Sequence, residues 1–136
     1  MWSSCMVDFR EKVAWTPELK QLLAPAMAHD PLNSICALEH DVAEGICSVV
    51  VGYERQKIVL AFVTRIDVGE FGKELVIVAG ASQGHGNTKK SIPVFVALAR
   101  KYGCEYIRIH TRLKALGRIL YSQGFEFSEM VLRKQV

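Results

Sequence analysis

Three apolar runs rich in β-branched residues follow one another in the middle of the chain, and only short turns separate them. The runs span Ile46–Tyr53, Ile58–Ile66 and Lys73–Ala79. Runs of this length and composition are typical of β-strands. Because parallel neighbours need a crossover of roughly a dozen residues or more, such short turns allow only antiparallel pairing of consecutive strands. The sequence therefore predicts an antiparallel meander at the centre of the fold.

The pattern changes after the third strand. A loop of small residues, Gly80–Thr88, leads into Lys89–Tyr102, where apolar residues recur at the three- and four-residue spacings of a helix face. Gly103 suits the left-handed position that ends many helices. Tyr106–His110 then alternates apolar and polar residues as a strand does. A strand, a helix and another strand in this order predict a crossover connection beside the meander.

The front of the chain carries weaker signals. Met6–Arg10 alternates as a short edge strand would. Thr16 followed by Pro17 predicts the start of a helix, which we expect Pro25 to end or kink. The segment Asn33–His40 suits either a short second helix or a strand.

The end of the chain predicts one more helix and one more strand. Leu113, Leu116 and Leu120 share one face of a helix, which we expect to end at Gly124. We expect Phe125–Arg133 to form a final strand. These elements together predict an α+β fold with a mixed sheet. The 136 residues contain no linker or repeat and half of them are hydrophobic, so we expect one domain over residues 1–136.

Composition excludes several classes of protein. No apolar run approaches the roughly 18–20 residues of a membrane-spanning helix, and the first ten residues do not resemble a secretory signal, so we expect a cytoplasmic protein. The net charge of +3 suits an anionic small molecule or a nucleic acid without selecting between them. We expect reduced thiols and no metal site, because the cysteines are widely separated at positions Cys5, Cys36, Cys47 and Cys104.

The loop before the long helix has the composition of an anion site. Gly84 and Gly86 allow close backbone approach, and main-chain N–H groups at a helix start attract negative charge. Gln83 adds an amide donor, while Lys89 and Lys90 add positive charge. A pyrophosphate would fit this loop, and so would the alternative of an ordinary surface turn. The Walker and G-x-G-x-x-G nucleotide patterns are both absent, since Lys89 occupies the third glycine position of the latter.

Three short motifs follow in order from this loop. Gln83–Thr88 reads Q-G-H-G-N-T, Ala99–Cys104 reads A-R-K-Y-G-C and Leu120–Phe125 reads L-Y-S-Q-G-F. Together they resemble the GNAT superfamily of N-acetyltransferases, whose corresponding patterns are Q/R-x-x-G-x-G/A, A-R-x-x-G-C and L-Y-x-x-G-F. Thr88 departs from the first pattern, where the family has glycine or alanine. The resemblance is strong over Lys73–Lys134 and only topological before that.

This resemblance implies a fold and a co-substrate. The fold is a mostly antiparallel, twisted sheet flanked by helices, in which the fourth and fifth strands, Lys73–Ala79 and Tyr106–His110, splay apart. Acetyl-CoA would lie in that gap and pass its acetyl group to an amine acceptor. Main-chain amides of the loop would hold the pyrophosphate, and backbone groups near Val78 would bind the pantetheine and polarise the thioester carbonyl. The positions that the resemblance assigns to acetyl-CoA are Val78, Gln83, Gly84, His85, Gly86, Asn87 and Thr88.

The resemblance also implies catalytic roles. Tyr121 stands where the family has the acid that protonates the leaving thiolate, although an aromatic packed on the last helix would look the same. Glu74 and His110 are the two candidates for the base that deprotonates the amine. Each has a simpler reading, Glu74 as a solvated charge and His110 as a hydrogen-bonding histidine. His85 fits better beside a phosphate than as a base.

Two further functions stay open. A catalytically inactive GNAT-fold module, such as a phage virion or regulatory protein, is favoured by Thr88 and by Lys114, which replaces the asparagine usual in the family. Gln83–Gly86 and Tyr121 favour the enzyme. Monomer and homodimer are both compatible with the sequence.

The second open function is nucleic-acid binding, which rests on a basic group made of Arg108, Arg112, Lys114 and Arg118. This group would contact a nucleic acid or the CoA 3′-phosphate, or it would simply form a solvated face.

Overall fold

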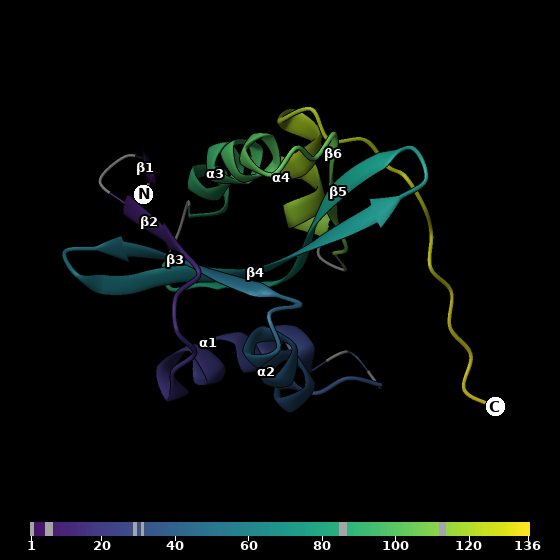
Figure 1. Ribbon diagram of the computed structural model, residues 1–136. Helices are drawn as coiled ribbons and strands as arrows, with labels where there is room; N and C mark the ends of the chain where they lie inside the picture. Colours follow the sequence, from purple (N-terminus) through teal and green to yellow (C-terminus); the bar gives the residue numbers. More distant parts are fainter. Residues whose placement is uncertain (1, 5–6, 29, 31, 85–86, 112–113) are drawn as a thin grey trace.

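The computed structural model describes residues 2–4, 7–28, 30, 32–84, 87–111 and 114–136. Within these ranges the chain forms one six-stranded sheet and four helices (Figure 1). In chain order the elements are β1 (Trp2–Ser4), β2 (Val7–Glu11), α1 (Pro17–Met27), α2 (Ile35–Ala43), β3 (Ser48–Glu54), β4 (Lys57–Gly69), β5 (Gly72–Ser82), α3 (Asn87–Lys101), β6 (Tyr106–Ile109) and α4 (Lys114–Ser122).

The strands lie in the sheet in the order in which they occur in the chain. β1 to β5 pair antiparallel with their neighbours, whereas β6 pairs parallel with β5. The predicted meander of β3, β4 and β5 and the crossover to β6 are therefore confirmed. α1 and α2 cover one face of the sheet, and α3 and α4 cover the other (Figure 1).

Each face of the sheet has its own apolar core. Neighbouring residues such as Val49 and Val50 are both buried, one in each core, which explains why the central strands are continuously apolar. The core under α1 and α2 contains Leu19, Leu23, Leu38, Cys47, Val49, Val51, Ala61, Val63 and Ala79. The core under α3 and α4 contains Val7, Phe9, Val50, Leu60, Phe62, Leu75, Ile77, Ile92, Val94, Phe95, Leu98, Ala99 and Leu120.

The first two helices begin at capping residues. Thr16 Oγ1 accepts a hydrogen bond from the Leu19 amide at 3.2 Å, as the sequence predicts. The ambiguous second segment is α2, where Ser34 Oγ accepts from the Ala37 amide at 3.3 Å. α1 does not end before Pro25 but continues to Met27. Because Pro25 lies in the last turn, its missing N–H removes only a hydrogen bond at the frayed end of the helix.

Glycines close the last two helices, as predicted. Gly103 and Gly124 have φ angles of +70° and +90°, in the left-handed region. The Cys104 amide donates to the Ala99 carbonyl at 2.7 Å, and the Phe125 amide donates to the Leu120 carbonyl at 3.1 Å. These bonds end α3 and α4 and set the direction in which the chain leaves each helix.

The two ends of the chain differ from the prediction. β1 (Trp2–Ser4) was not predicted, and the predicted strand Phe125–Arg133 is wrong, since residues 125–136 form no regular element. A strand-like sequence forms a strand only when a neighbour pairs with its backbone. In the described ranges there is also no helix long and apolar enough to cross a bilayer.

Candidate active site

A gap opens between β5 and β6 where their pairing stops. The parallel ladder joins Glu74–Ile77 to Tyr106–Ile109. β5 continues to Ser82, and this second half pairs with β4 alone among the described strands. β6 ends at Ile109, so beyond Ile77 β5 has no described strand on this side, and this unpaired stretch is the gap that the predicted splay requires.

A β-bulge lies at the start of this gap. Val63 is opposite Ala79, but the next residue of β4, Thr64, is opposite Ile77, so Val78 is the extra residue. A bulge increases local twist and takes one residue out of the regular ladder. It also reverses the two faces of β5, because Ile77 packs under α3 and α4 whereas Ala79 packs under α1 and α2. The bulged Val78 is thus the first residue of β5 beyond its ladder with β6.

The loop at the end of β5 is tied to β4. The Gln83 amide donates to the Val59 carbonyl at 2.7 Å, so it is already engaged. The Asn87 side chain is 5% exposed, and its Nδ2 lies 3.0 Å from the Gln83 carbonyl and 3.4 Å from the Val59 carbonyl. Gly84 has φ +101°. His85 and Gly86, which are also predicted to contact the pyrophosphate, lie outside the described residues.

The Asn87 side chain is therefore a structural tether for this loop. From the sequence alone, Asn87 is predicted only as a donor to a pyrophosphate. Its position at the junction of loop and helix could have indicated the second role, because asparagine at a helix start characteristically bonds to nearby backbone.

The start of α3 is electrostatically positive. The first N–H groups of a helix have no partner within the helix, and the helix dipole adds partial positive charge there. The first turn contains no acidic residue and includes Lys89 and Lys90. Thr88 is half-buried, and its carbonyl accepts from Ser91 Oγ at 2.7 Å. This end of α3 is therefore suited to an anion.

An open cavity of about 550 Å³ lies beside the same loop. It is on the β4 side of Gln83, not in the gap between β5 and β6, and it reaches the start of α1 and the β3–β4 turn. Its lining residues are Val13, Thr16, Glu18, Leu19, Tyr53, Gln56, Lys57, Ile58 and Gln83.

The three predicted catalytic residues lie on different elements: Glu74 on β5, Tyr121 on α4 and His110 just after β6. His110 directly follows Ile109, which is opposite Ile77, so His110 is level with the bulge at Val78. Glu74 is four residues before Val78, about 13 Å along an extended strand. Tyr121 lies in the last turn of α4 and is 56% exposed. Of the two base candidates, the register brings only His110 to the level of the gap.

Glu74 instead belongs to a group of ion pairs on β4, β5 and β6. Its Oε1 lies 3.2 Å from Arg108 Nε. Asp67 accepts from Arg65 Nε at 2.7 Å and from Arg108 Nη2 at 2.9 Å. The hydrogen bond from Arg65, outweighing desolvation, and the charges of both arginines hold the pKa of Asp67 below its usual range.

The same ion pairs change the interpretation of the predicted basic group. Arg108 faces Asp67 and Glu74 and so does not add to a free basic surface. Arg112 lies outside the described residues. Arg118 is exposed on α4. In the part of the chain that the structure describes, no three His, Cys, Asp or Glu side chains form a group that could hold a metal ion.

Solved structures share this architecture across nearly the whole chain. A Trypanosoma brucei acetyltransferase superposes with a TM-score of 0.70 at 17% identity, covering 95% of this chain and 100% of that one. An aminoglycoside acetyltransferase from an uncultured soil metagenomic sample, in complex with sisomicin, gives 0.69 at 15% identity, covering 96% and 95%. A predicted Clostridium acetobutylicum acetyltransferase with acetyl-CoA gives 0.67 at 12% identity, covering 96% of each chain.

At the level of sequence, no family model and no curated protein matches the chain. Because the superpositions cover at least 95% of both chains, they include the antiparallel meander and the crossover to the parallel β6. The chain therefore has the α+β fold of the GNAT acetyltransferases, in which β5 and β6 are the splayed fourth and fifth strands of the prediction.

Proposed function

We propose that this protein is an N-acyltransferase that transfers an acetyl group from acetyl-CoA to an amine by direct attack. The observation that carries the proposal is the combination of the bulge at Val78, the end of the β5–β6 ladder and the positive start of α3. Together they offer an extended binding path, with an anion site at one end and a gap between strands at the other.

The anion site would hold the CoA pyrophosphate. Since the Gln83 amide is bonded to Val59, the donors would come from Gly84 onwards, including the main-chain amides of His85, Gly86, Asn87 and Thr88. The buried Asn87 side chain would keep this part of the loop in place. The backbone of the bulged Val78 lies out of the regular ladder and would pair with the pantetheine and polarise the thioester carbonyl.

Direct transfer requires a base that takes a proton from the amine and an acid that protonates the departing thiolate. Acetyl-CoA supplies an activated thioester, and the protein contributes mainly by positioning the amine beside it. His110, level with Val78, would remove a proton from the amine. Tyr121 would protonate the thiolate as it leaves. Glu74 is the alternative base, but its carboxylate is paired with Arg108.

Binding of acetyl-CoA should raise the thermal stability of the protein. At a concentration one hundred times the Kd, a ligand that binds only the folded state stabilises it by about 2.7 kcal/mol. Thermal melting with and without acetyl-CoA measures this, and pantetheine, which lacks the pyrophosphate, is the control. We expect a clearly smaller shift with pantetheine. Identical melting curves with and without acetyl-CoA would contradict the proposal.

Turnover should depend on Tyr121 and His110. Tyr121→Phe and His110→Gln are each expected to lower the rate of CoA thiol release by about 100-fold, the usual contribution of acid–base catalysis. Because both side chains are largely exposed, stability should change by less than about 0.5 kcal/mol. A panel of amines provides the acceptors, and Glu74→Gln is the matched control for the base. Full activity in Tyr121→Phe would refute the acid role, and loss of turnover only in Glu74→Gln would make Glu74 the base.

An inactive module on the same fold is the second candidate. Thr88 occupies the position where a small residue would leave more room for a pyrophosphate, and Tyr121 has an exposed side chain. Stabilisation by acetyl-CoA without thiol release for any amine would favour this candidate over the enzyme.

A further inference from the structure

The open cavity beside the loop lies apart from the proposed site of acetyl transfer. Gln83, which lines the cavity, follows Val78 by five residues, a distance of about 16 Å along an extended strand. The apolar side chains of the lining belong to the core under α1 and α2 or pack against it. A molecule in this cavity would therefore not reach the thioester at the bulge, so the cavity needs a separate explanation.

Strained backbone lies beside this cavity. Among the described residues other than glycine, positive φ angles occur at Lys12 (+55°), Arg55 (+51°) and Gln56 (+65°). Gln56 lines the cavity, Arg55 precedes it in the β3–β4 turn, and Lys12 directly precedes Val13, which also lines the cavity. Side chains in this region of φ cost free energy, and such residues gather at functional sites. The strained non-glycine positions of the described chain thus border one cavity.

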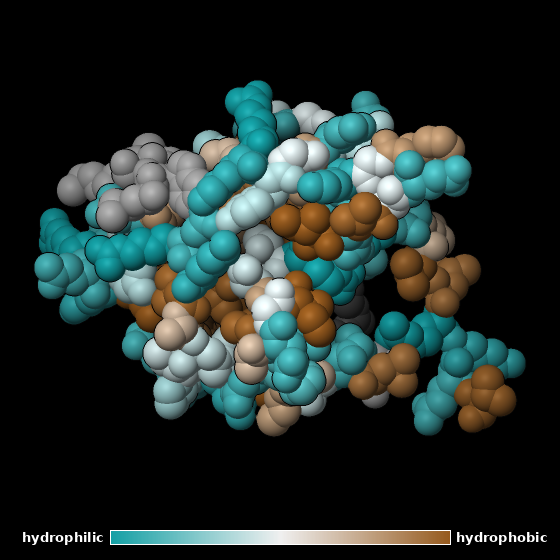
Figure 2. Space-filling model, in the orientation of Figure 1, coloured by the Kyte–Doolittle hydropathy of each residue, from teal (hydrophilic) through white to brown (hydrophobic). Residues whose placement is uncertain are grey.

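The cavity combines apolar walls with two opposite charges. Figure 2 shows hydrophobic surface between α1 and the sheet, next to the hydrophilic side chains of the β3–β4 turn. Glu18 lies in the first turn of α1 and Lys57 begins β4, so the charges come from different elements. Among the residues that the structure describes, neither side chain belongs to an ion pair. Both charges are available to a ligand.

An aromatic ring and two amides complete the lining. The Tyr53 ring is half-buried, and the Arg10 guanidinium lies 5.2 Å from its centroid. Such a ring offers a flat apolar surface against which another apolar group can pack. The exposed side chains of Gln56 and Gln83 add amide groups, each of which can donate and accept hydrogen bonds.

We propose that this cavity binds a free amino acid with an apolar side chain. The carboxylate of the ligand would pair with Lys57 and its ammonium group with Glu18, while its side chain would pack against Ile58 and Tyr53. A simple anion or cation would leave one of the two charges without a partner, whereas a zwitterion satisfies both. The volume of about 550 Å³ lies within the usual range of small-molecule sites.

Amide NMR spectra of the full chain, titrated with L-phenylalanine and L-leucine, test this proposal. Saturable shifts should gather at the amides of Ile58 and Gln83 and be absent at Ile107 on β6. The absence of a saturable shift with either amino acid would overturn the proposal, and so would shifts that gather away from the cavity. The titration contains no acetyl-CoA, so its outcome is independent of the proposed activity.

Variants and ligand analogues together assign the two charges. Lys57→Gln should weaken the binding of L-phenylalanine and of hydrocinnamate, which lacks the ammonium group, by about tenfold. It should leave phenethylamine, which lacks the carboxylate, unaffected. Glu18→Gln should weaken L-phenylalanine and phenethylamine but not hydrocinnamate.

The matched controls are Lys134→Gln and Glu44→Gln, which remove the same charges at exposed positions outside the lining. Their affinities for L-phenylalanine should equal that of the wild type. If Lys57→Gln and Glu18→Gln bound L-phenylalanine as tightly as these controls, the charges would not hold the ligand and the proposal would be wrong.

Discussion

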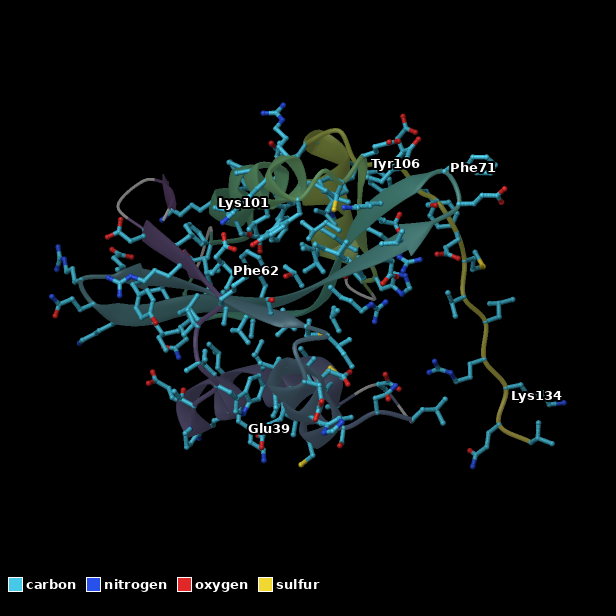
Figure 3. The ribbon with its side chains drawn as sticks, viewed as in Figure 1. Glu39, Phe62, Phe71, Lys101, Tyr106 and Lys134 are labelled. Carbon is cyan, nitrogen blue, oxygen red and sulfur yellow. The ribbon has the colours of Figure 1, made fainter. Side chains whose placement is uncertain are left out.

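Replacing Phe62 with alanine is expected to lower the free energy of unfolding by about 3–5 kcal/mol, the usual loss for a large buried aromatic. Phe62 is 2% exposed and points from β4 towards α3 (Figure 3). Its ring meets that of Phe95 edge to face, with centroids 4.7 Å apart and planes at 89°. The substitution would remove this contact and leave a cavity between α3 and the sheet.

Chemical denaturation measures this loss, and Ile66→Ala is the control. Ile66 lies on the same strand and the same face but is 38% exposed, so its truncation should cost less than about 1 kcal/mol. Acetyl-CoA binding should weaken in Phe62→Ala as well, because Phe95 belongs to the helix whose start forms the anion site. Equal stability losses in the two variants would show that α3 does not depend on this contact.

Replacing Asn87 with aspartate is expected to disrupt the loop that precedes α3. Asn87 Nδ2 donates to the carbonyls of Gln83 and Val59, and an ionised carboxylate there would face two acceptors inside the protein. The expected cost at neutral pH is about 2–4 kcal/mol of stability, together with at least about a tenfold weaker affinity for acetyl-CoA. The burial and the facing carbonyls favour the protonated acid, which can donate, so the loss of stability should shrink as the pH falls.

Unfolding measured across pH, combined with calorimetric titration of acetyl-CoA, tests this expectation. Gln83→Glu makes the same amide-to-carboxylate change in the same loop at an exposed position, and it should alter stability by less than about 0.5 kcal/mol. If Asn87→Asp proved as stable as Gln83→Glu, the buried amide would not be the tether of the loop.

Most elements could be predicted from the sequence because their signals are local. Thr16 and Pro17 mark the start of α1, and Gly103 and Gly124 close α3 and α4, since each acts on backbone within a turn or two. The β-branched runs and the short turns between them were sufficient to predict the meander of β3, β4 and β5. Phe125–Arg133 was wrongly predicted as a strand, because a strand also needs a neighbouring strand, which this segment's own residues do not provide.

The candidate site was predicted less completely than the fold. The loop and the start of α3 could be located from Gly84 and the two lysines. The roles of individual side chains could not, because they depend on partners far along the chain. Glu74 is predicted as a free base, but its carboxylate is paired with Arg108. Asn87 is predicted as a ligand donor, but its side chain donates to the carbonyl of Val59.

The sequence by itself determined the order and type of the central elements, because strand runs, turns and helix ends depend on residues close together in the chain. Only the tertiary structure decided where β5 leaves β6, which residue forms the bulge and which charges are paired. Those features depend on the register between strands, and register is set by the packing of both cores at once. His110 is level with the bulge at Val78 for this reason, although 31 residues lie between them in the sequence.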